Sequence, residues 1–268
     1  MRSKSKRRQE ERTPPAKPGS ASHPVVWREN FSSIVVTAIL FLFFTTFTAQ
    51  AFVIPSGSME NTLQIGDRPF ADNVSLAPRT TWLGPLLPYS DVHRGDIIIF
   101  LHPAESDRKH MVKRVIGVPG DRIRIVRRSV MVNGHFIVEP YKVHKAPAID
   151  DYADNFPSPP NGMVYPSWRE EMPHHINAQG ELVLPENRYF VMGDNRDNSN
   201  DSRFWGFVPR EAILGRPFVV YWSLERTEKD YEKNGGGDRI GDAISLLLSL
   251  PRDTRWDRLF RTFPRVNP

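Results

Sequence analysis

Residues 111–138 read MVKRVIGVPGDRIRIVRRSVMVNGHFIV and predict four short strands in succession. Residues 122–126 alternate polar and apolar side chains with a period of two, as expected of a half-buried strand. Residues 130–138 place apolar residues on both sides of Asn133-Gly134, the strongest short-range signal for a β-hairpin. Residues 111–117 form a further apolar segment that ends in a turn sequence. This stretch therefore predicts antiparallel β structure.

The chain on either side continues the pattern. Further strands are expected at residues 96–100, 188–192 and 218–222, and no long amphipathic helix is expected between residues 64 and 238. We therefore predict a mainly β fold, an antiparallel β sandwich or barrel-like domain over residues 55–234. Within it, the proline-rich residues 144–175 are predicted to form a long surface loop.

An uncharged apolar run, FSSIVVTAILFLFFTTFTAQAFVI, occupies residues 31–54 and precedes this domain. As a helix it would be about 36 Å long, enough to cross the ~30 Å hydrocarbon layer with some tilt. Residues 1–30, predicted to be a basic disordered cytoplasmic tail, carry eight Lys or Arg and three Glu, which accounts for the whole net charge of +5. This asymmetry indicates a single-pass transmembrane helix and argues against nucleic-acid binding.

A cleaved secretory signal is the alternative interpretation of this run, and Ala49-Gln50-Ala51 resembles a cleavage site. Signal h-regions are usually ~7–15 residues long, so the run favours a retained anchor. In either case the chain after residue 55 is expected on the outer side of the cytoplasmic membrane. Residues 235–268 read as a glycine linker and a basic amphipathic tail, which either packs on the domain or lies on a bilayer surface. The absence of cysteine excludes disulfides, thiolate metal sites and a thiol nucleophile.

Residues 54–63, IPSGSMENTL, place two serines directly after the apolar run. Serine needs an activating base to act as a nucleophile. A serine–histidine–acid triad stays open, although no G-x-S-x-G motif supports it. Lys113 is a second candidate base because, in a strand, it shares one face with Met111 and Val115, and burial there would lower its pKa. The alternative is a lysine that protects an edge strand from aggregation.

Three motifs resemble the bacterial type I signal peptidase (leader peptidase) family: Ser56-Gly57-Ser58-Met59, KRVIGVPGD at residues 113–121 and GDNRDNSNDSR at residues 193–203. RGDIIIF at residues 94–100 is similar to a fourth family box, and the resemblance covers roughly residues 50–223. It implies a membrane-anchored serine endopeptidase that removes signal peptides from exported preproteins after A-x-A-like sites, through an acyl-enzyme.

The resemblance also implies roles for individual residues. Ser58 matches the nucleophile and Lys113 the general base, Ser56 and the Ser58 N–H match the oxyanion hole, and Ser199 matches the serine that orients the lysine. Positions that shape the site are matched by Gly193, Asp194, Asp201 and Arg203. Candidate walls of the substrate pockets are Phe52, Ile54, Met59, Leu63 and Val112. Asn61 departs from the family, which usually has proline or serine there.

The expected partners are signal-peptide-bearing preproteins and the lipid bilayer of the bacterial cytoplasmic (inner) membrane, with the export machinery as a further candidate. No cofactor and no metal are expected. His144, His174, His175, Asp150 and Asp151 match no metal-ligand spacing and read as loop residues, and residues 193–203 lack the spacing of an EF-hand. Trp82, Leu83, Leu86 and Leu87 are hypothesised to dip into lipid.

Two other functions stay open from the sequence. One is an anchored, non-catalytic β domain that binds exported polypeptides or envelope partners. The other is a related serine–lysine protease with a dedicated substrate, such as a self-cleaving regulator. Ala49-Gln50-Ala51 also leaves self-cleavage beside the anchor open. The joint presence of Ser56, Ser58, Lys113 and Ser199 favours the peptidase.

Overall fold

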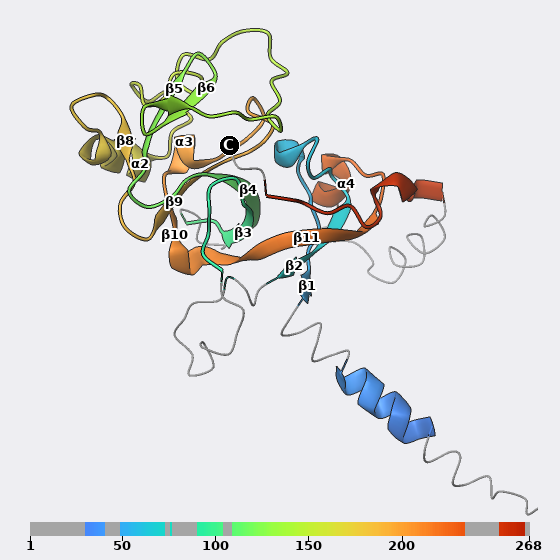
Figure 1. The fold of residues 1–268 in the computed structure, drawn as a ribbon. Helices are drawn as coiled ribbons and strands as arrows, with labels where there is room; N and C mark the ends of the chain where they lie inside the picture. Colours follow the sequence, from blue (N-terminus) through green and yellow to red (C-terminus); the bar gives the residue numbers. More distant parts are fainter. Residues whose placement is uncertain are drawn as a thin grey trace, which may run out of the picture. The chain divides into compact units, whose positions relative to one another are not determined.

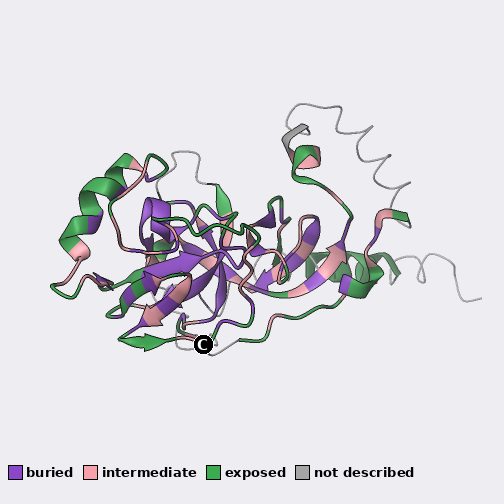
Figure 2. Ribbon diagram, turned by 90° about the horizontal axis from the view of Figure 1, so that it is seen from above, coloured by how far each residue is buried: buried purple, intermediate pink, exposed green. Residues whose placement is uncertain are grey.

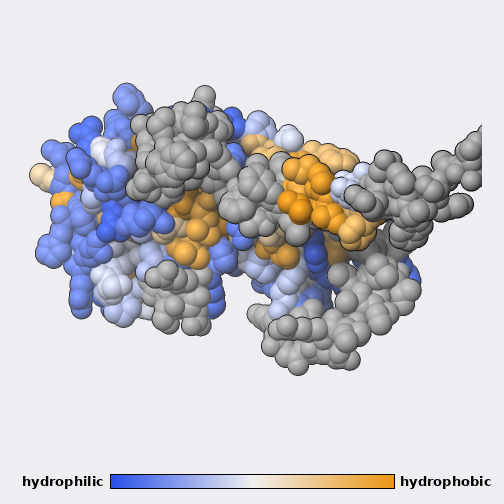
Figure 3. Space-filling model, turned by 90° about the horizontal axis from the view of Figure 1, so that it is seen from below, coloured by the Kyte–Doolittle hydropathy of each residue, from blue (hydrophilic) through white to orange (hydrophobic). Residues whose placement is uncertain are grey.

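The computed structural model describes residues 30–40, 49–72, 76, 90–103, 109–233 and 252–265. The chain divides into two compact units, residues 1–43 and 44–268. Residues 30–40 of the first unit form a helix, and apolar side chains such as Ile34 and Leu40 are more than 60% exposed. Figure 3 shows exposed hydrophobic side chains in orange on the face that is seen from below. No helix among the described residues is both apolar and long enough for a bilayer crossing.

The second unit is built on two antiparallel sheets (Figure 1). The larger has seven strands in the order β1-β2-β11-β3-β4-β9-β10, and the smaller has four in the order β7-β6-β5-β8. Their bounds are β1 Ala49–Ala51, β2 Asp67–Asp72, β3 Ile97–Leu101, β4 His110–Gly117, β5 Arg122–Val126, β6 Ser129–Val132, β7 His135–Phe136, β8 Leu182–Val183, β9 Arg188–Met192, β10 Val208–Pro209 and β11 Ile213–Ser223. The helices of this unit are short: α2 Pro166–Glu171, α3 Ser202–Trp205 and α4 Glu228–Lys233, with 3-10 turns η1 Gly57–Met59, η3 Met172–His175, η4 Arg210–Ala212 and η5 Trp256–Arg258.

The mainly antiparallel β architecture confirms the expectation from the alternating segments. Asn133 and Gly134 both have positive φ, the conformation that a two-residue hairpin turn requires, and they join β6 to β7. β1 and β10 are the outer strands of the seven-stranded sheet, so among the described strands this sheet is open and not a closed barrel.

β4 is an interior strand with β3 on one side and β9 on the other. It pairs Lys113 with Ile98 of β3 and Arg114 with Met192 of β9. The pairing with β9 covers only Arg114–Gly117, but the Lys113 side chain is 2% exposed, whereas a lysine that protects a sheet edge projects into solvent. The edge-strand interpretation of Lys113 is therefore wrong. Both faces of β4 are covered, because Lys113 and Arg114 point to opposite faces and each is only 2% exposed.

The buried residues gather in the middle of the domain (Figure 2) and form two apolar clusters. The larger cluster joins the two sheets and includes Phe100, Val115 and Phe190. The smaller cluster consists of Ile54, Met59, Leu63, Ile97 and Val220, with Val112 and Phe263 packed against it. It lies directly beneath the turn that carries the two serines, so packing fixes the position of that turn.

The predicted bounds of the apolar helix are wrong at its C-terminal end. Ala49–Ala51 forms β1, which pairs with Phe70–Asp72 of β2, and the Phe52 N–H continues the pairing by donating to the Pro69 carbonyl at 3.0 Å. Ala49–Ala51 therefore belongs to the sheet, and residues 52–54 are not helical. Residues 41–48 lie outside the described part of the chain.

Residues 144–175 are also more than a surface loop. Tyr152, Phe156, Val164 and Trp168 are each at most 3% exposed and belong to the larger cluster. The proline-rich composition concealed them, because their spacing follows neither the strand nor the helix period. Trp82, Leu83, Leu86 and Leu87, hypothesised to enter lipid, lie outside the described residues.

The C-terminal segment, defined here as residues 252–265, packs on the domain. Val219 of β11 forms a β-bridge with Thr262, Leu224 just after β11 forms one with Thr254, and Arg258 is buried. These contacts agree with the interpretation that this segment packs on the domain. The glycine-rich residues 235–237 lie outside the described part of the chain.

Candidate active site

Ser58 lies on η1, a single 3-10 turn between β1 and β2, and Ser56 is the residue directly before this turn. Met59 and Leu63, at 1% and 0% exposure, are held in the smaller apolar cluster and turn the intervening polar side chains outward. Ser56 is exposed and Ser58 is half-buried. Their hydroxyl oxygens are 3.4 Å apart. The two hydroxyls are therefore adjacent, in the turn that follows the outer strand β1.

Asn61, the departure from the family pattern, has a left-handed backbone with φ of 74°. Asparagine tolerates this conformation better than most residues, whereas proline is fixed near −65°. The carbonyl of Asn61 accepts a hydrogen bond from Arg261 Nη2 at 3.0 Å. The turn after the serines thus has a sharp bend that suits asparagine.

Lys113 lies on β4 facing the same cavity as the serines. Residues Phe52, Ile54, Ser56, Ser58, Met59, Val112 and Lys113 all line this space, which has a volume of about 170 Å³. Burial lowers the pKa of Lys113 from 10.5 to about 8, against the opposing pull of the Asp201 carboxylate. The cavity therefore brings a hydroxyl together with an amine that loses its proton close to neutral pH.

Four of the five predicted pocket residues line this cavity, namely Phe52, Ile54, Met59 and Val112. Leu63 does not; it is completely buried behind the cavity. Sequence reasoning missed other lining residues: Val53, Pro55, His102, Lys109, His110, Met111 and Asn200. Met111 had a usable signal, since it shares a strand face with Lys113, and Val53 and Pro55 are sequence neighbours of the predicted Phe52 and Ile54. His102 and Asn200 come from segments whose proximity only the fold determines.

Ser199 is 8% exposed and lies close to the Asp201 carboxylate without a hydrogen bond of good geometry. Gly193 lies between this serine and the serine turn: a Cβ added to Gly193 would be 2.3 Å from Ser199 Oγ and 2.5 Å from the Ser58 carbonyl oxygen. The absence of a side chain at Gly193 therefore lets the 193–203 segment pack directly against Ser58. The Asn195 N–H closes this contact by donating to the Ser58 carbonyl at 3.1 Å.

Two buried ion pairs hold together the segments that carry the site residues. Arg114 donates from Nε to Asp194 Oδ1 at 2.8 Å and from Nη2 to Asp194 Oδ2 at 2.7 Å. Thr62, on the serine turn, donates to the same carboxylate at 2.5 Å. Asp194 thus connects the strand of Lys113 to the turn of Ser58.

The second pair joins Asp201 and Arg203. Arg203 Nε and Nη2 each donate to the Asp201 carboxylate at 2.9 Å, and the Gly193 N–H donates to it at 3.1 Å. Burial raises the pKa of Asp201, but the Arg203 guanidinium more than offsets this effect, so the pKa is lowered overall. All four residues predicted to shape the site therefore surround it.

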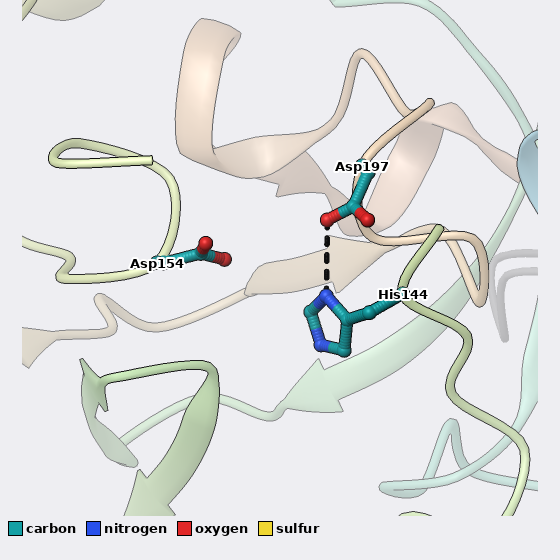
Figure 4. Close-up of side chains that lie close together, drawn as sticks. All are labelled: His144, Asp154 and Asp197. Atoms are coloured by element: carbon teal, nitrogen blue, oxygen red, sulfur yellow. Dashed lines mark hydrogen bonds and ion pairs between the residues drawn. The ribbon is translucent and has the colours of Figure 1, made fainter. Parts of the chain in front are cut away.

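His144, Asp154 and Asp197 form the group of potential metal ligands found among the described residues (Figure 4). His144 Nδ1 lies 3.0 Å from Asp197 Oδ1, and the other Asp197 oxygen accepts from the N–H groups of Lys145 and Ala146. Asp154 accepts from Arg128 Nε at 2.9 Å. The carboxylates are thus already paired, and the cluster fits a structural role better than metal binding. Of the loop residues considered as ligands from sequence, only His144 belongs to it.

Comparison with known proteins shows the family of this chain. Residues 27–222 match the family model described as signal peptidase, peptidase S26. The probable signal peptidase I-2 of Synechocystis sp. is 36% identical over 205 residues, which is 75% of each chain. The signal peptidase I of Aquifex aeolicus is 33% identical over 254 residues, covering 83% of this chain and 93% of the relative.

Among solved structures, a signal peptidase I from Enterococcus faecalis V583 is 29% identical, with a TM-score of 0.34 over 47% of this chain and 97% of that one. The class defined by the family model and the curated relatives is that of serine peptidases, which are hydrolases. Within this class, the chain belongs to the signal peptidase family, peptidase S26.

Proposed function

We propose that the protein is an endopeptidase that cleaves signal peptides from exported preproteins, with Ser58 as nucleophile and Lys113 as general base. One observation carries this proposal. Lys113 is buried, its pKa is lowered to about 8, and it lines the same cavity as Ser58. Family membership supports the substrate class.

In the proposed mechanism, the neutral Lys113 amine accepts the Ser58 proton while Oγ attacks the scissile carbonyl. The Ser58 N–H and the Ser56 hydroxyl stabilise the resulting oxyanion, and each such donor contributes roughly 2.7–4 kcal/mol in comparable enzymes. The Lys113 ammonium then protonates the leaving amine, which departs with the mature chain. The Lys113 amine, neutral again, next takes a proton from a water molecule. This water hydrolyses the acyl-enzyme and frees the signal peptide.

The cavity presents apolar surface to a bound peptide. Phe52, Ile54 and Met59 line it beside the serines, which suits apolar side chains such as that of alanine. This agrees with cleavage after A-x-A-like sites. Ser199 is proposed to orient the Lys113 amine from the opposite side of Gly193.

We further propose that residues 31–48 of the apolar run, which precede β1, anchor the enzyme in the bacterial cytoplasmic membrane, with the site on its outer side. β1 and η1 follow the run within a few residues, so the nucleophile would lie close to the bilayer. If so, the full-length protein stays in the membrane pellet after alkaline carbonate extraction. Release into the supernatant would contradict the anchor and leave the dyad untouched.

The dyad is tested with purified full-length protein in detergent and a preprotein substrate. Ser58→Ala and Lys113→Met are each expected to lower cleavage by at least 1,000-fold, in line with losses at other catalytic triads. His102 is the control, because it lines the same cavity at 3% exposure and could replace lysine as the base. Full activity of Lys113→Met together with loss in His102→Gln would replace the dyad by a histidine mechanism. Cleavage by both Ser58→Ala and Lys113→Met would reject the proposal.

A further inference from the structure

The C-terminal segment contacts the turn that carries Ser58 through three arginines spaced three residues apart. Arg255, Arg258 and Arg261 together donate to the Asn61, Thr62 and Ile65 carbonyls and to the Gln64 side chain. These acceptors lie within five consecutive residues, immediately after the serines. The family model ends at residue 222, so it gives these arginines no role.

Arg258 is the centre of this contact. It is 2% exposed, and its Nε and Nη2 donate to the two oxygens of Asp67 at 2.9 and 2.5 Å. The same Nη2 donates to the Thr62 carbonyl at 3.2 Å. Asp67 is itself completely buried and also accepts from the Gln64 N–H at 2.8 Å. One guanidinium therefore fixes both ends of the residue 62–67 segment.

The backbone of the C-terminal segment is attached to the sheet independently of these side chains. The Val220 N–H donates to the Arg261 carbonyl at 2.9 Å, and the Phe260 N–H donates to the Val220 carbonyl at 2.8 Å. Phe263 packs against the apolar cluster that holds Met59. The arginines are thus presented from a fixed support, so their positions restrain the serine turn.

Thr62 links this restraint to the base. Its carbonyl accepts from Arg258, and its hydroxyl donates to Asp194, which is paired with Arg114, the residue next to Lys113. The contacts run without interruption from the C-terminal segment through the serine turn to β4. A shift of the turn would change the position of Ser58 relative to the amine.

We propose that the C-terminal segment positions the nucleophile, with Arg258 and Arg261 as positioning residues for the serine–lysine reaction. This inference rests on the proposed function of Ser58 and Lys113. Because attack requires close alignment of the reacting atoms, small displacements of Ser58 lower kcat more than substrate binding.

The test compares Arg258→Lys, Arg261→Ala and the control Arg252→Ala by steady-state cleavage of a preprotein. Arg261 is exposed and reaches the turn through one hydrogen bond, so its removal leaves the fold intact. Arg252 is exposed on the same segment, and the hydrogen bonds from this segment to residues 61–65 in the described structure come from the other three arginines. We expect kcat to fall about 3–10-fold in Arg261→Ala and at least 10-fold in Arg258→Lys, with KM within twofold of wild type and Arg252→Ala unchanged.

The pH profile and thermal unfolding separate positioning from loss of folded protein. Lys113 keeps its surroundings in these variants, so the acid midpoint of kcat/KM stays at the wild-type pH while its plateau falls. Assays run at least 15 °C below the measured Tm keep each variant folded. Wild-type kcat in Arg261→Ala and in folded Arg258→Lys would overturn the inference; if Arg258→Lys does not fold, Arg261→Ala decides. Inactive wild type, or active Ser58→Ala, would instead reject the proposed function.

Discussion

A Cβ atom on Gly193 would lie 2.3 Å from the hydroxyl oxygen of Ser199, far inside the distance that two such atoms tolerate. The same atom would also collide with the carbonyl oxygen of Ser58. Glycine is required here because of close approach and not because of its backbone angles. The contact packs the 193–203 segment, which carries Ser199, directly against the serine turn, which carries Ser58.

Gly193→Ala is expected to lower stability by about 1–3 kcal/mol, the usual cost of overpacking, and to reduce cleavage more strongly than stability alone explains. The reason is that Ser58 or Ser199 must move to admit the methyl group. Gly162→Ala is the matched control, since nothing lies within 4 Å of its added Cβ. Urea unfolding and preprotein cleavage measure the two effects. A Gly193→Ala enzyme with wild-type kcat would contradict the close packing.

Lys113 predicts a characteristic pH dependence of activity. Only the neutral amine accepts a proton from Ser58, so kcat/KM is expected to rise about tenfold per pH unit below its pKa and to level off above about pH 8. The substrate should lack titrating groups near the cleavage site. A profile that is flat between pH 6 and 9 would count against Lys113 as the base.

The same group predicts a pH dependence of stability with a definite sign. Its pKa is lower in the folded protein than in the unfolded chain, so between about pH 8 and 10.5 the unfolded chain binds more protons. The Lys113 contribution to the free energy of unfolding therefore rises across this window, by roughly 3 kcal/mol in total. The difference in the free energy of unfolding between wild type and Lys113→Met, measured by urea unfolding at each pH, isolates the Lys113 contribution. A constant difference from pH 8 to 10.5 would show that Lys113 is not buried.

The Arg114–Asp194 pair is expected to be important for stability. Asp194→Asn leaves the Arg114 cation buried without its counter-charge, which typically costs 3–5 kcal/mol. The pair between Lys145 and Glu60 is the control: at 2.6 Å it is equally close, but its side chains are 57% and 36% exposed. Lys145→Gln should therefore cost at most about 1 kcal/mol. Equal costs in urea unfolding would mean that burial does not distinguish the two pairs.

The cluster of His144, Asp154 and Asp197 predicts no metal dependence. Burial raises the pKa of Asp197, but the hydrogen bonds from His144 and from two backbone N–H groups outweigh this and lower it. Arg128 Nε donates to Asp154 Oδ2, so the charge of this carboxylate is already balanced. Chelator, or added Zn²⁺ at low micromolar concentration, should change neither Tm nor cleavage rate. A Tm increase with Zn²⁺ that is absent in His144→Gln would establish a metal site.

Local patterns in the sequence were sufficient to predict several strands of the two sheets. The alternation of residues 122–126 and the Asn133-Gly134 turn predicted β5, β6 and β7 closely, because these features depend on neighbours along the chain. The family motifs singled out Ser58 and Lys113, and the fold places both on one cavity. Leu63 was assigned to the cavity by its closeness in sequence, yet its side chain points into the apolar cluster behind it.

The sequence by itself determined that this chain forms short antiparallel strands and that a serine turn and a lysine strand are its chemical elements. Only the tertiary structure decided that Ala49–Ala51 joins the sheet, that Tyr152 and Trp168 are core residues, and that Arg258 is buried against Asp67, 191 positions away. Periodicity reports the environment of a segment but not the identity of its partner. Partners so far apart in the chain are selected by packing and charge pairing of the whole domain, which no local pattern encodes.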